Sequence, residues 1–345
     1  MKGEPLAGWQ AYHLYYHEDL GRAIDGFARP AVAACRERGL LKRFFFIRYG
    51  FGGPHLRLRL EPLPGREAEV GDLVRRTAES FFAASPSLLS LAPEDIRRTN
   101  ANLAANDSQL EGDPVQPDNS LLAAPFVPEA GRYGGAELLP ANLDYFQLSS
   151  AHVFYFRDLG AGLAKTQLLP LSLLELLRPA LGFASCREEL LDLARYAAVW
   201  AKESGDLFVQ RGNEAYERSA PHFHGKIRGR LENFLAGREV WGPPLSAGAR
   251  RLAWEARDLK PERRRTLAVG QIHMLANRLG LSNAEEIYIG QILARSLDDL
   301  LAEPELAARL AGRLAMTAEP EPLAAAVEAS FAFAAPAPVS SRSGG

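Results

Sequence analysis

Cationic side chains recur at alternate positions in a stretch that otherwise has the composition of a buried strand. The sequence RFFFIRYGFGGPHLRLRL covers residues 43–60. Because side chains alternate between the two faces of a strand, its second half predicts one face of leucines. His55, Arg57 and Arg59 then share the opposite face. Three positive or ionisable groups on one strand face could bind an anion.

The first half of this stretch adds a further cation. Arg48 alternates with Phe44 and Phe46, so these three share a face, and a hairpin of the two halves could gather several cations on one side of a sheet. A buried guanidinium needs an anion or a full set of acceptors, and its planar fork matches a carboxylate or a phosphate. The pattern predicts a carboxylate pocket. The alternative is a solvated sheet face on which Arg57 and Arg59 have no function.

A second cation lies in a glycine-rich segment. Arg132 occurs within GRYGG, residues 131–135, and is expected at the end of a strand. Glycines on both sides indicate a tight turn or a close approach of the backbone to a ligand. The alternative is an ordinary loop that exposes an arginine.

A third pattern could transfer protons. QIHMLANRLGLS, residues 271–282, has helical character, and His273 and Asn277 are four residues apart, so they share one helix face. Histidine titrates near neutral pH and is the usual proton shuttle. The alternative is a core histidine whose hydrogen bonds are satisfied within the protein.

Other patterns that could carry chemistry are incomplete. His222 and His224 lack a third residue at metal-ligand spacing, so no metal site is predicted. The serines at 149–150 lack the surroundings of an activated nucleophile, and GFGG is not a nucleotide-binding fingerprint. Cys35 and Cys186 form no paired motif, which indicates a reducing compartment. No cofactor is predicted.

The elements that must position these residues change in character along the chain. The N-terminal half predicts the order strand, helix, strand, strand, helix, strand, which is a ferredoxin-like, split βαβ arrangement. Pro30 is expected to kink or divide the first helix, and Gly39 to end it. The predicted segments are residues 9–17, 19–38, 43–49, 55–60, 67–83 and 126–132.

A polar segment without clear periodicity, residues 99–125, precedes the last of these strands and is expected to be a functional or mobile loop.

The C-terminal half has helical periodicity. Pro179, Gly182, Gly205, Pro243 and Pro244 are expected to separate its helices. The predicted helices are residues 141–156, 167–177, 187–202, 224–236, 261–279 and 283–301.

The fold class predicted from these halves is α+β. We expect one domain over residues 1–316, with an α+β part at about 8–134 and a helical part at about 135–316. Residues 317–345 are rich in Ala, Pro and Ser and are predicted to be mostly disordered, with a short helix before Phe333.

Composition excludes several classes of partner. The 345 residues include 40 Lys and Arg against 42 Asp and Glu, a net charge of −2. Such a balance does not favour direct nucleic-acid or membrane binding, so any anion site must be local. The N-terminus lacks a signal-peptide pattern and no apolar run is long enough to cross a bilayer. These features predict a soluble, cytoplasmic protein.

Taken together and in this order, the motifs resemble one family. WQAYHLYYH, FFFIRYGFGGPHLRLRL, VPEAGRYGG and QIHMLANRLGLS are similar to the C-terminal domain of lantibiotic dehydratases. That domain also occurs as a free-standing thiopeptide-type bacteriocin biosynthesis protein. The resemblance covers roughly residues 8–305.

The resemblance implies an activity. In that family a larger domain uses glutamyl-tRNA to esterify Ser or Thr of a ribosomal precursor peptide, and the domain that this chain resembles eliminates the glutamate. Dehydroalanine or dehydrobutyrine results. The resemblance implies that Arg59, Arg132 and His273 are catalytic. It also implies substrate-binding roles for Arg48, His55, Arg57 and Asn277.

The chain is too short to include the esterifying domain, so the resemblance implies a separate glutamylating enzyme as partner, together with the precursor peptide. It leaves a complex with that partner and a homodimer both open. Two alternative functions remain. Relatives in thiopeptide pathways join two dehydroalanines in a formal [4+2] cycloaddition, and a non-catalytic subunit could simply present the peptide.

Overall fold

The computed structural model describes residues 4–89, 91–106, 114–197, 205–238 and 242–335, which form two compact units. Each unit is built from separate stretches of the chain. The sheet unit comprises Leu6–Phe126, Ala151–Ala161 and Glu328–Gly345. The helical unit comprises Met1–Pro5, Val127–Ser150 and Gly162–Val327. The architecture is α+β, as predicted.

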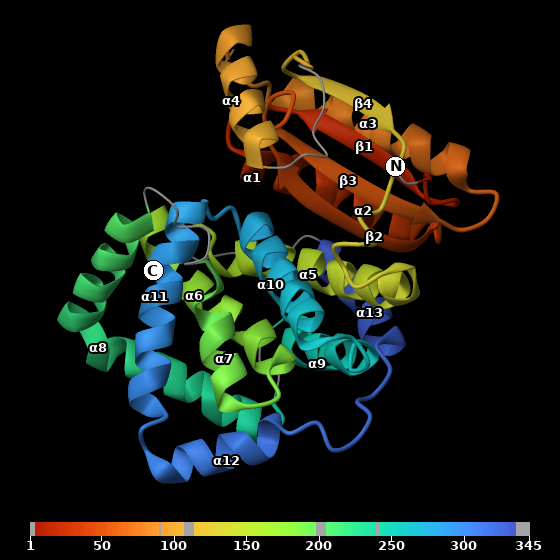
Figure 1. The fold of residues 1–345 in the computed structure, drawn as a ribbon. Helices are drawn as coiled ribbons and strands as arrows, with labels where there is room; N and C mark the ends of the chain where they lie inside the picture. Colours follow the sequence, from red (N-terminus) through yellow and green to blue (C-terminus); the bar gives the residue numbers. More distant parts are fainter. Residues whose placement is uncertain (1–3, 90, 107–113, 198–204, 239–241, 336–345) are drawn as a thin grey trace, which may run out of the picture. The chain divides into compact units, whose positions relative to one another are not determined.

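The sheet unit contains a four-stranded sheet (Figure 1). Its strands are β1 (Gln10–Tyr15), β2 (Leu41–Tyr49), β3 (His55–Pro62) and β4 (Ser120–Ala124). They are ordered β2-β3-β1-β4 and pair antiparallel throughout. β3 is therefore hydrogen-bonded on both sides, to β1 and to β2. The ferredoxin-like description of this half stays a prediction.

Helices cover the apolar face of the sheet, with α2 and α3 lying against it in Figure 1. Leu14 of β1 and the leucines of β3 are fully buried on this face. Burying a leucine side chain contributes about 1.5–3 kcal/mol, so this face is a main source of the unit's stability. The helices are α1 (Leu20–Ala23), the π-helical turn η1 (Ile24–Ala28), α2 (Arg29–Glu37), α3 (Glu67–Ala84) and α4 (Pro93–Asn106).

Two sequence expectations for this unit are wrong. The last strand lies at Ser120–Ala124, within the segment predicted to be a loop, whereas residues 126–132 form no strand. That segment also contains the second half of α4, although residues 107–113 lie outside the described part of the chain. The expectation for Pro30 is confirmed, because the π-helical turn η1 ends two residues before it and separates α1 from α2 at the place where proline cannot supply a helical N–H.

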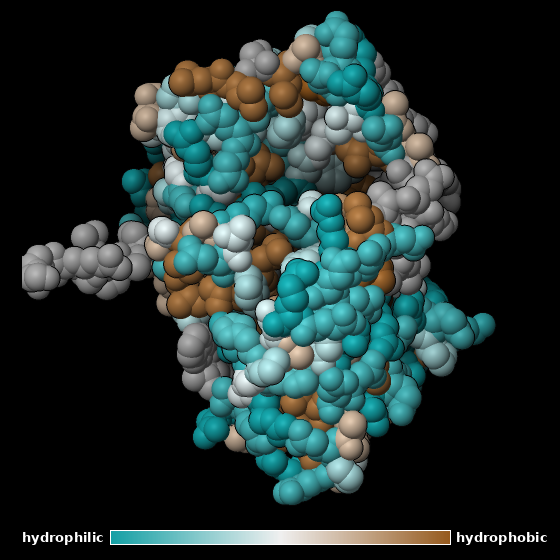
Figure 2. All heavy atoms as spheres, turned by 90° about the vertical axis from the view of Figure 1, so that its left-hand side faces the viewer, coloured by the Kyte–Doolittle hydropathy of each residue, from teal (hydrophilic) through white to brown (hydrophobic). Residues whose placement is uncertain are grey.

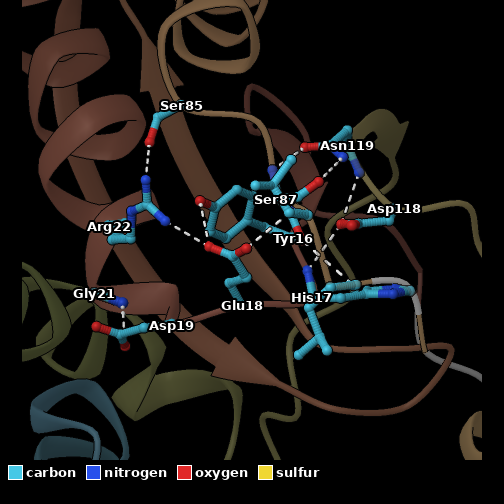
Figure 3. A network of polar contacts seen from close by, with 12 residues as sticks. Tyr16, His17, Glu18, Asp19, Gly21, Arg22, Ser85, Ser87, Asp118 and Asn119 are labelled. Carbon is cyan, nitrogen blue, oxygen red and sulfur yellow. Dashed lines mark hydrogen bonds and ion pairs between the residues drawn. The ribbon is translucent and has the colours of Figure 1, made fainter.

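A polar network holds the end of β1 (Figure 3). The Glu18 carboxylate accepts hydrogen bonds from Arg22, from Tyr16 and from the backbone N–H of Leu88. The Asp118 carboxylate accepts a bond of 2.8 Å from the backbone N–H of His17. The network therefore ties the end of β1 to the chain that follows α3 and to the start of β4.

The side-chain amide of Asn119 closes the same region: its Oδ1 accepts from the backbone N–H of Ser87, and its Nδ2 donates to the backbone oxygen of Ser87. Asn119 has φ of 52°, a left-handed conformation that asparagine tolerates better than most residues.

The C-terminal segment packs into the sheet unit. Phe331 is buried and its ring lies 5.3 Å from that of Phe44 on β2. The Arg29 side chain donates to the backbone oxygens of Ala334 and Ala335 and forms an ion pair with Asp158. α13 (Ala324–Ser330) and the 3-10 turn η4 (Phe331–Ala334) thus occupy part of the predicted tail, whereas residues 336–345 lie outside the described part.

The helical unit contains most of the remaining helices (Figure 1). Two of its predicted helices, α10 and α11, agree with the structure to within one residue at each end. The helices from α5 onward are α5 (Leu139–Leu159), α6 (Lys165–Phe183), α7 (Arg187–Ala194), α8 (Gly205–Leu235), α9 (Leu245–Glu255), α10 (Pro261–Leu279), α11 (Asn283–Leu300) and α12 (Pro304–Leu314). A short 3-10 turn, η2 (Ala136–Leu138), precedes α5.

Other boundaries in this half differ from the prediction. Pro179 and Gly182 lie inside α6 instead of ending it, because the surrounding α6 side chains are buried and tertiary packing outweighs the local preference. α7 is shorter than predicted and α8 begins at Gly205, whereas residues 198–204 lie outside the described part. The patterns of α9 and α12 were not recognised as helices in the sequence.

The surface is dominated by polar side chains on the face drawn in Figure 2, where hydrophobic side chains form separate patches. Within the described part of the chain, no helix combines the length and the apolar character needed to cross a bilayer.

The glycine turn between β2 and β3 supports a prediction about stability. Gly53 has φ of +115°, and a Cβ there would lie 3.0 Å from His17 Nε2. Gly65 also has a positive φ, of +79°, but a Cβ there would meet nothing within 4 Å. We expect Gly53→Ala to lower the free energy of unfolding by about 2–3 kcal/mol and Gly65→Ala by about 1–2 kcal/mol. Urea denaturation of both variants measures the difference. Equal losses would show that the contact with His17 contributes nothing.

Candidate functional site

The strand pairing gathers rings and cations on one face of the sheet. His13 pairs with Arg57, Ala11 with Arg59, and Phe45 with Arg59 in the register of the sheet. Paired residues of antiparallel strands lie on the same face. This face, called here the cationic face, carries His13, Tyr15, Phe45, Tyr49, His55, Arg57 and Arg59. His55, Arg57 and Arg59 therefore share one face, as the alternation predicted.

A chain of hydrogen bonds orients Arg57. Its Nε donates to His55 Nε2 at 3.0 Å, and His55 Nδ1 donates to the backbone oxygen of Gly53 at 2.8 Å. This arrangement requires neutral His55 with its proton on Nδ1. The guanidinium carbon of Arg57 also lies 3.6 Å from the centre of the Tyr49 ring, a cation–π contact. His55 thus positions the arginine.

Both imidazoles of the cationic face are held neutral. Burial, and after it the positive charge of Arg57, lower the pKa of His55 to about 3. Burial and then Arg57 lower the pKa of His13 to about 2. The rings of these two histidines stack at 5.1 Å. At neutral pH, the positive charge of this face therefore comes from arginine.

Aromatic rings enclose Arg59. Its guanidinium carbon lies 4.4 Å from the centre of the Phe126 ring and 5.2 Å from that of Phe45. Trp9 packs edge-on against both rings. Arg57 and Arg59 are two residues apart on β3, so their Cα atoms are about 7 Å apart. Two pre-oriented forks at this spacing can hold a small molecule with more than one carboxylate.

Arg48 does not join this face. It pairs with Leu56, so it lies on the apolar face, opposite to the other cations. Its Nη1 is 3.6 Å from the Asp19 carboxylate. Burial lowers the pKa of Arg48 to about 10, and Asp19 opposes that shift. The sequence placed Arg48 with Phe44 and Phe46 correctly, but pairing with β3 separates that face from His55, Arg57 and Arg59.

In the helical unit, His273 is hydrogen-bonded to a buried carboxylate. Its Nδ1 lies 3.1 Å from Glu286 Oε2, and the hydroxyl of Tyr196 donates to the same oxygen at 2.5 Å. The His273 side chain is 28% exposed, whereas that of Glu286 is 1% exposed. A carboxylate accepts the Nδ1 proton, so Nε2 is the nitrogen with a lone pair for a proton. Burial and Glu286 raise the pKa of Tyr196 well above its ordinary value.

Two other residues of the α10 motif differ in burial. Arg278 is fully buried; its Nη1 donates to Ser149 Oγ, and its guanidinium lies 5.1 Å from the Phe146 ring centre. Burial lowers the pKa of Arg278 to about 10. Asn277 is partly exposed one helical turn after His273, on the same face as predicted, and its backbone oxygen accepts the Gly280 N–H that ends the helix.

Arg132 lies in a turn and not at the end of a strand. Its Nη1 donates to Glu129 Oε2 at 2.9 Å, and both side chains are 56% exposed. The neighbouring glycines, Gly134 and Gly135, have φ of +90° and +116°, so the GRYGG motif makes a tight turn. Tyr133 is buried and anchors this turn against the Phe146 ring.

The site chemistry that these residues allow is acid–base and electrostatic. Among the described residues, no group of three or more His, Cys, Asp or Glu could hold a metal ion. The cationic face can bind a carboxylate, and His273 backed by Glu286 can take up or release a proton.

A comparison with known families decides where the chain belongs. Residues 9–297 match the family described as lantibiotic biosynthesis dehydratase C-term. The chain belongs to this family. No curated protein matches it significantly.

Several solved structures share the fold of this chain. The pyridine synthase TbtD from thiomuracin biosynthesis has a TM-score of 0.69 at 18% identity, covering 87% of this chain and 99% of TbtD. The tRNA-dependent lantibiotic dehydratase MibB from Microbispora sp. 107891 has a TM-score of 0.53 at 17% identity, covering 88% of this chain but 29% of MibB. TsrL has a TM-score of 0.53 at 14% identity, covering 88% and 97%.

Several residues of the candidate site were missed in the sequence. Glu286 and Tyr196 have no local signal, because the bonds of Glu286 to His273 and to Tyr196 depend on how α10, α11 and the residues after α7 pack. Phe126 likewise follows β4 and reaches Arg59 only through the fold. His13 could have been found, since it alternates with Ala11 and Tyr15 on a recognised strand.

The buried imidazoles generate a prediction about pH. The folded-state pKa of His55 is about 3 against an ordinary 6.5, so between these values the unfolded chain binds more protons. Stability therefore rises with pH across this window and is lost as pH falls through it. We expect His55→Asn to flatten the pH dependence of the free energy of unfolding by about 1.4 kcal/mol per pH unit.

Urea denaturation between pH 4 and pH 7 makes this measurement. His222→Asn is the matched control, because His222 is exposed and should leave the slope of the wild type unchanged. Parallel curves for His55→Asn and the wild type would contradict a neutral, buried His55.

Proposed function

We propose that this chain eliminates glutamate from glutamylated Ser or Thr residues of a ribosomal precursor peptide, in the cytoplasm, to give dehydroalanine or dehydrobutyrine. The observation that carries the proposal is the pair Arg57 and Arg59, both oriented on one face of β3 by aromatic rings and by neutral His55. Arginine forks held in this way suit a ligand with carboxylates, and a glutamyl group has them.

The elimination requires two tasks. A base removes the Cα proton of the esterified residue, the Cα–Cβ double bond forms, and the Cβ–O bond breaks, so that glutamate leaves as a carboxylate. We propose that Arg59 binds the glutamyl group and offsets the charge that develops on the leaving oxygens, assisted by Arg57. We assign Arg132 to the same task, with His55 and Asn277 as supporting residues. Arg48, on the other sheet face, is proposed to act only through the fold.

His273 is proposed to transfer the proton. The Glu286 carboxylate fixes its Nδ1 proton, which supports Nε2 as the base or as the acid toward the leaving group. Tyr196 supplies a second hydrogen bond to the same carboxylate oxygen, which lowers the cost of burying the charge.

The proposal includes partners. We propose that a separate glutamyl-tRNA-dependent enzyme esterifies the peptide before this chain acts on it. Either a complex with that enzyme or a homodimer is compatible with the proposal. A peptide-presenting subunit without activity would have no use for both the arginine pair and His273.

A second candidate function is pyridine formation by [4+2] cycloaddition. Its support is the similarity to TbtD, a pyridine synthase. The match with this chain covers 99% of the length of TbtD. At 18% identity that similarity supports the fold and not the reaction. A cycloaddition releases no glutamate, so it gives no reason for the arginines of the cationic face.

Mass spectrometry tests the proposed elimination. A precursor peptide already glutamylated at Ser or Thr is incubated with the purified chain, and loss of the glutamyl mass to give dehydro residues is expected. We expect Arg59→Ala and His273→Ala each to lower the rate by about 10²- to 10³-fold. Arg66→Ala is the control, because Arg66 is exposed and paired with Glu69.

Three other results are decisive. Full activity of either variant would refute the role assigned to that residue. An Arg59→Ala, His273→Ala double variant no slower than either single variant would indicate that both act in one step. An unchanged glutamylated peptide, with leader release and a new ultraviolet chromophore from a peptide carrying two dehydroalanines, would establish cycloaddition instead.

Glu286 gives a separate prediction as a positioning residue. We expect Glu286→Gln to lower kcat about a hundredfold with little change in KM, because the amide orients His273 but no longer accepts its proton as a carboxylate does. Glu286→Asp should restore part of the rate. Nitrogen NMR of the His273 ring reports the tautomer directly. A Glu286→Gln variant that keeps both kcat and the tautomer would exclude this role.

A further inference from the structure

An arginine-rich cavity lies in the helical unit, apart from the residues assigned to the reaction. Its volume is about 300 Å³, and residues of α6, α8, α9 and α12 and of the segment 320–326 line it. Glu321 is the one acidic residue among its described lining residues. The lining arginines are Arg178, Arg230, Arg238, Arg250 and Arg313.

Two of these arginines share a single carboxylate. Arg230 lies 2.6 Å from Glu175 Oε1, and Arg178 lies 3.1 Å from Glu175 Oε2. Glu175 is buried behind them. The shared carboxylate holds both guanidinium groups in place at this wall of the cavity.

Arg250 is held at the cavity without a carboxylate partner among the described residues. Its Nη2 donates to the backbone oxygens of Leu314 and Ala315, at 3.2 and 2.8 Å. Its Nη1 is buried and has no hydrogen-bond partner in the described part of the chain. Burial and the charge of Arg313 lower the pKa of Arg250, which means that its cation is under-compensated. A buried donor of this kind calls for an acceptor.

The remaining arginines add to the positive electrostatic potential in the cavity. Arg313 donates from Nε to the backbone oxygen of Phe234, and its guanidinium lies 5.7 Å from the centre of that ring. Arg238 is exposed at the rim. α9 begins at Leu245 beside the cavity, and the positive end of its helix dipole has the same sign.

The shape and the other lining residues limit the anion. The cavity is small, and Leu181, Phe234 and Leu323 give it apolar walls. A nucleic-acid backbone requires an extended positive surface, whereas a carboxylate on a side chain with an apolar neighbour fits a compact cavity of mixed character. Arginine forks also match a carboxylate in two-pronged geometry.

We propose that this cavity binds an acidic side chain of the precursor peptide, outside the residue that reacts. The proposal rests on the proposed function for the identity of the peptide, but the carboxylate specificity rests on Arg250 and Arg313 alone. A free dicarboxylate such as glutamate offers the same chemistry from another source, and the experiment separates the two.

Fluorescence anisotropy on the full chain is the test. The probe is a labelled octapeptide in which Leu and Glu alternate, compared with the same peptide carrying Gln. We expect the wild-type chain to bind the Gln peptide about tenfold more weakly than the Glu peptide. We expect the Arg250→Gln and Arg313→Gln variants to bind the Glu peptide about tenfold more weakly than the wild type does. Arg309→Gln is the matched control, since Arg309 pairs with Glu232 outside the cavity. Arg238→Gln, at an exposed position, gives a weakening that cannot arise from misfolding.

Each other outcome overturns the proposal. Equal binding of both peptides, or equal binding by all the variants, would exclude a carboxylate site in the cavity. Free glutamate, inorganic phosphate or single-stranded DNA could instead displace the probe at a lower concentration than the unlabelled Glu peptide does. If Arg250→Gln abolished that displacement, the cavity would be assigned to that ligand.

The two proposals fail separately. A chain inactive in elimination that still binds the Glu peptide through Arg250 would refute the proposed function and keep the cavity assignment. An active chain in which Arg250→Gln binds the peptide normally would support the proposed function and refute the cavity assignment.

Discussion

The two-residue period of β3 is the constraint on which the cationic face depends. Three leucines of this strand are fully buried against helices, so the intervening His55, Arg57 and Arg59 must share the other face. A slip of one residue in the pairing would bury guanidinium groups and expose leucine. Because β3 pairs on both sides, with β1 and β2, that slip would disrupt two ladders at once. The burial of the leucines thereby fixes the strand register that places His55, Arg57 and Arg59 on the cationic face.

The candidate site was predictable where it follows a local period. Alternation along β3 placed His55, Arg57 and Arg59 together, and the helical period placed His273 and Asn277 on one face. The same alternation says nothing about which faces of two strands coincide, so Arg48 proved to lie apart from the other cations. The roles of Glu286 and Tyr196 could not be predicted from the sequence, because only helix packing brings a buried carboxylate to His273.

The fold was predictable to a similar extent and for the same reason. α10 has a start signal at Pro261 and a stop signal at Gly280, and α11 begins with a capping box of Ser282 and Glu285; their predicted bounds agree with the structure to within one residue. β4 is only five residues long, has no buried side chain and shows no alternation of apolar and polar residues, so its sequence does not differ from that of a loop. Pro179 illustrates the opposite error, since a strong local signal gave way to the burial of α6 around it.

The sheet unit closes with the last described residues of the chain. Phe331 fills a place beside Phe44, and Arg29 bonds the backbone oxygens of Ala334 and Ala335, some 300 residues later in the sequence. A ribosome makes the chain from its N-terminus, so the sheet and its helices are synthesised long before the segment that completes their core. The core around Phe44 and Arg29 therefore stays incompletely packed during synthesis until residues 331–335 have left the ribosome, and its apolar surface is exposed for that time.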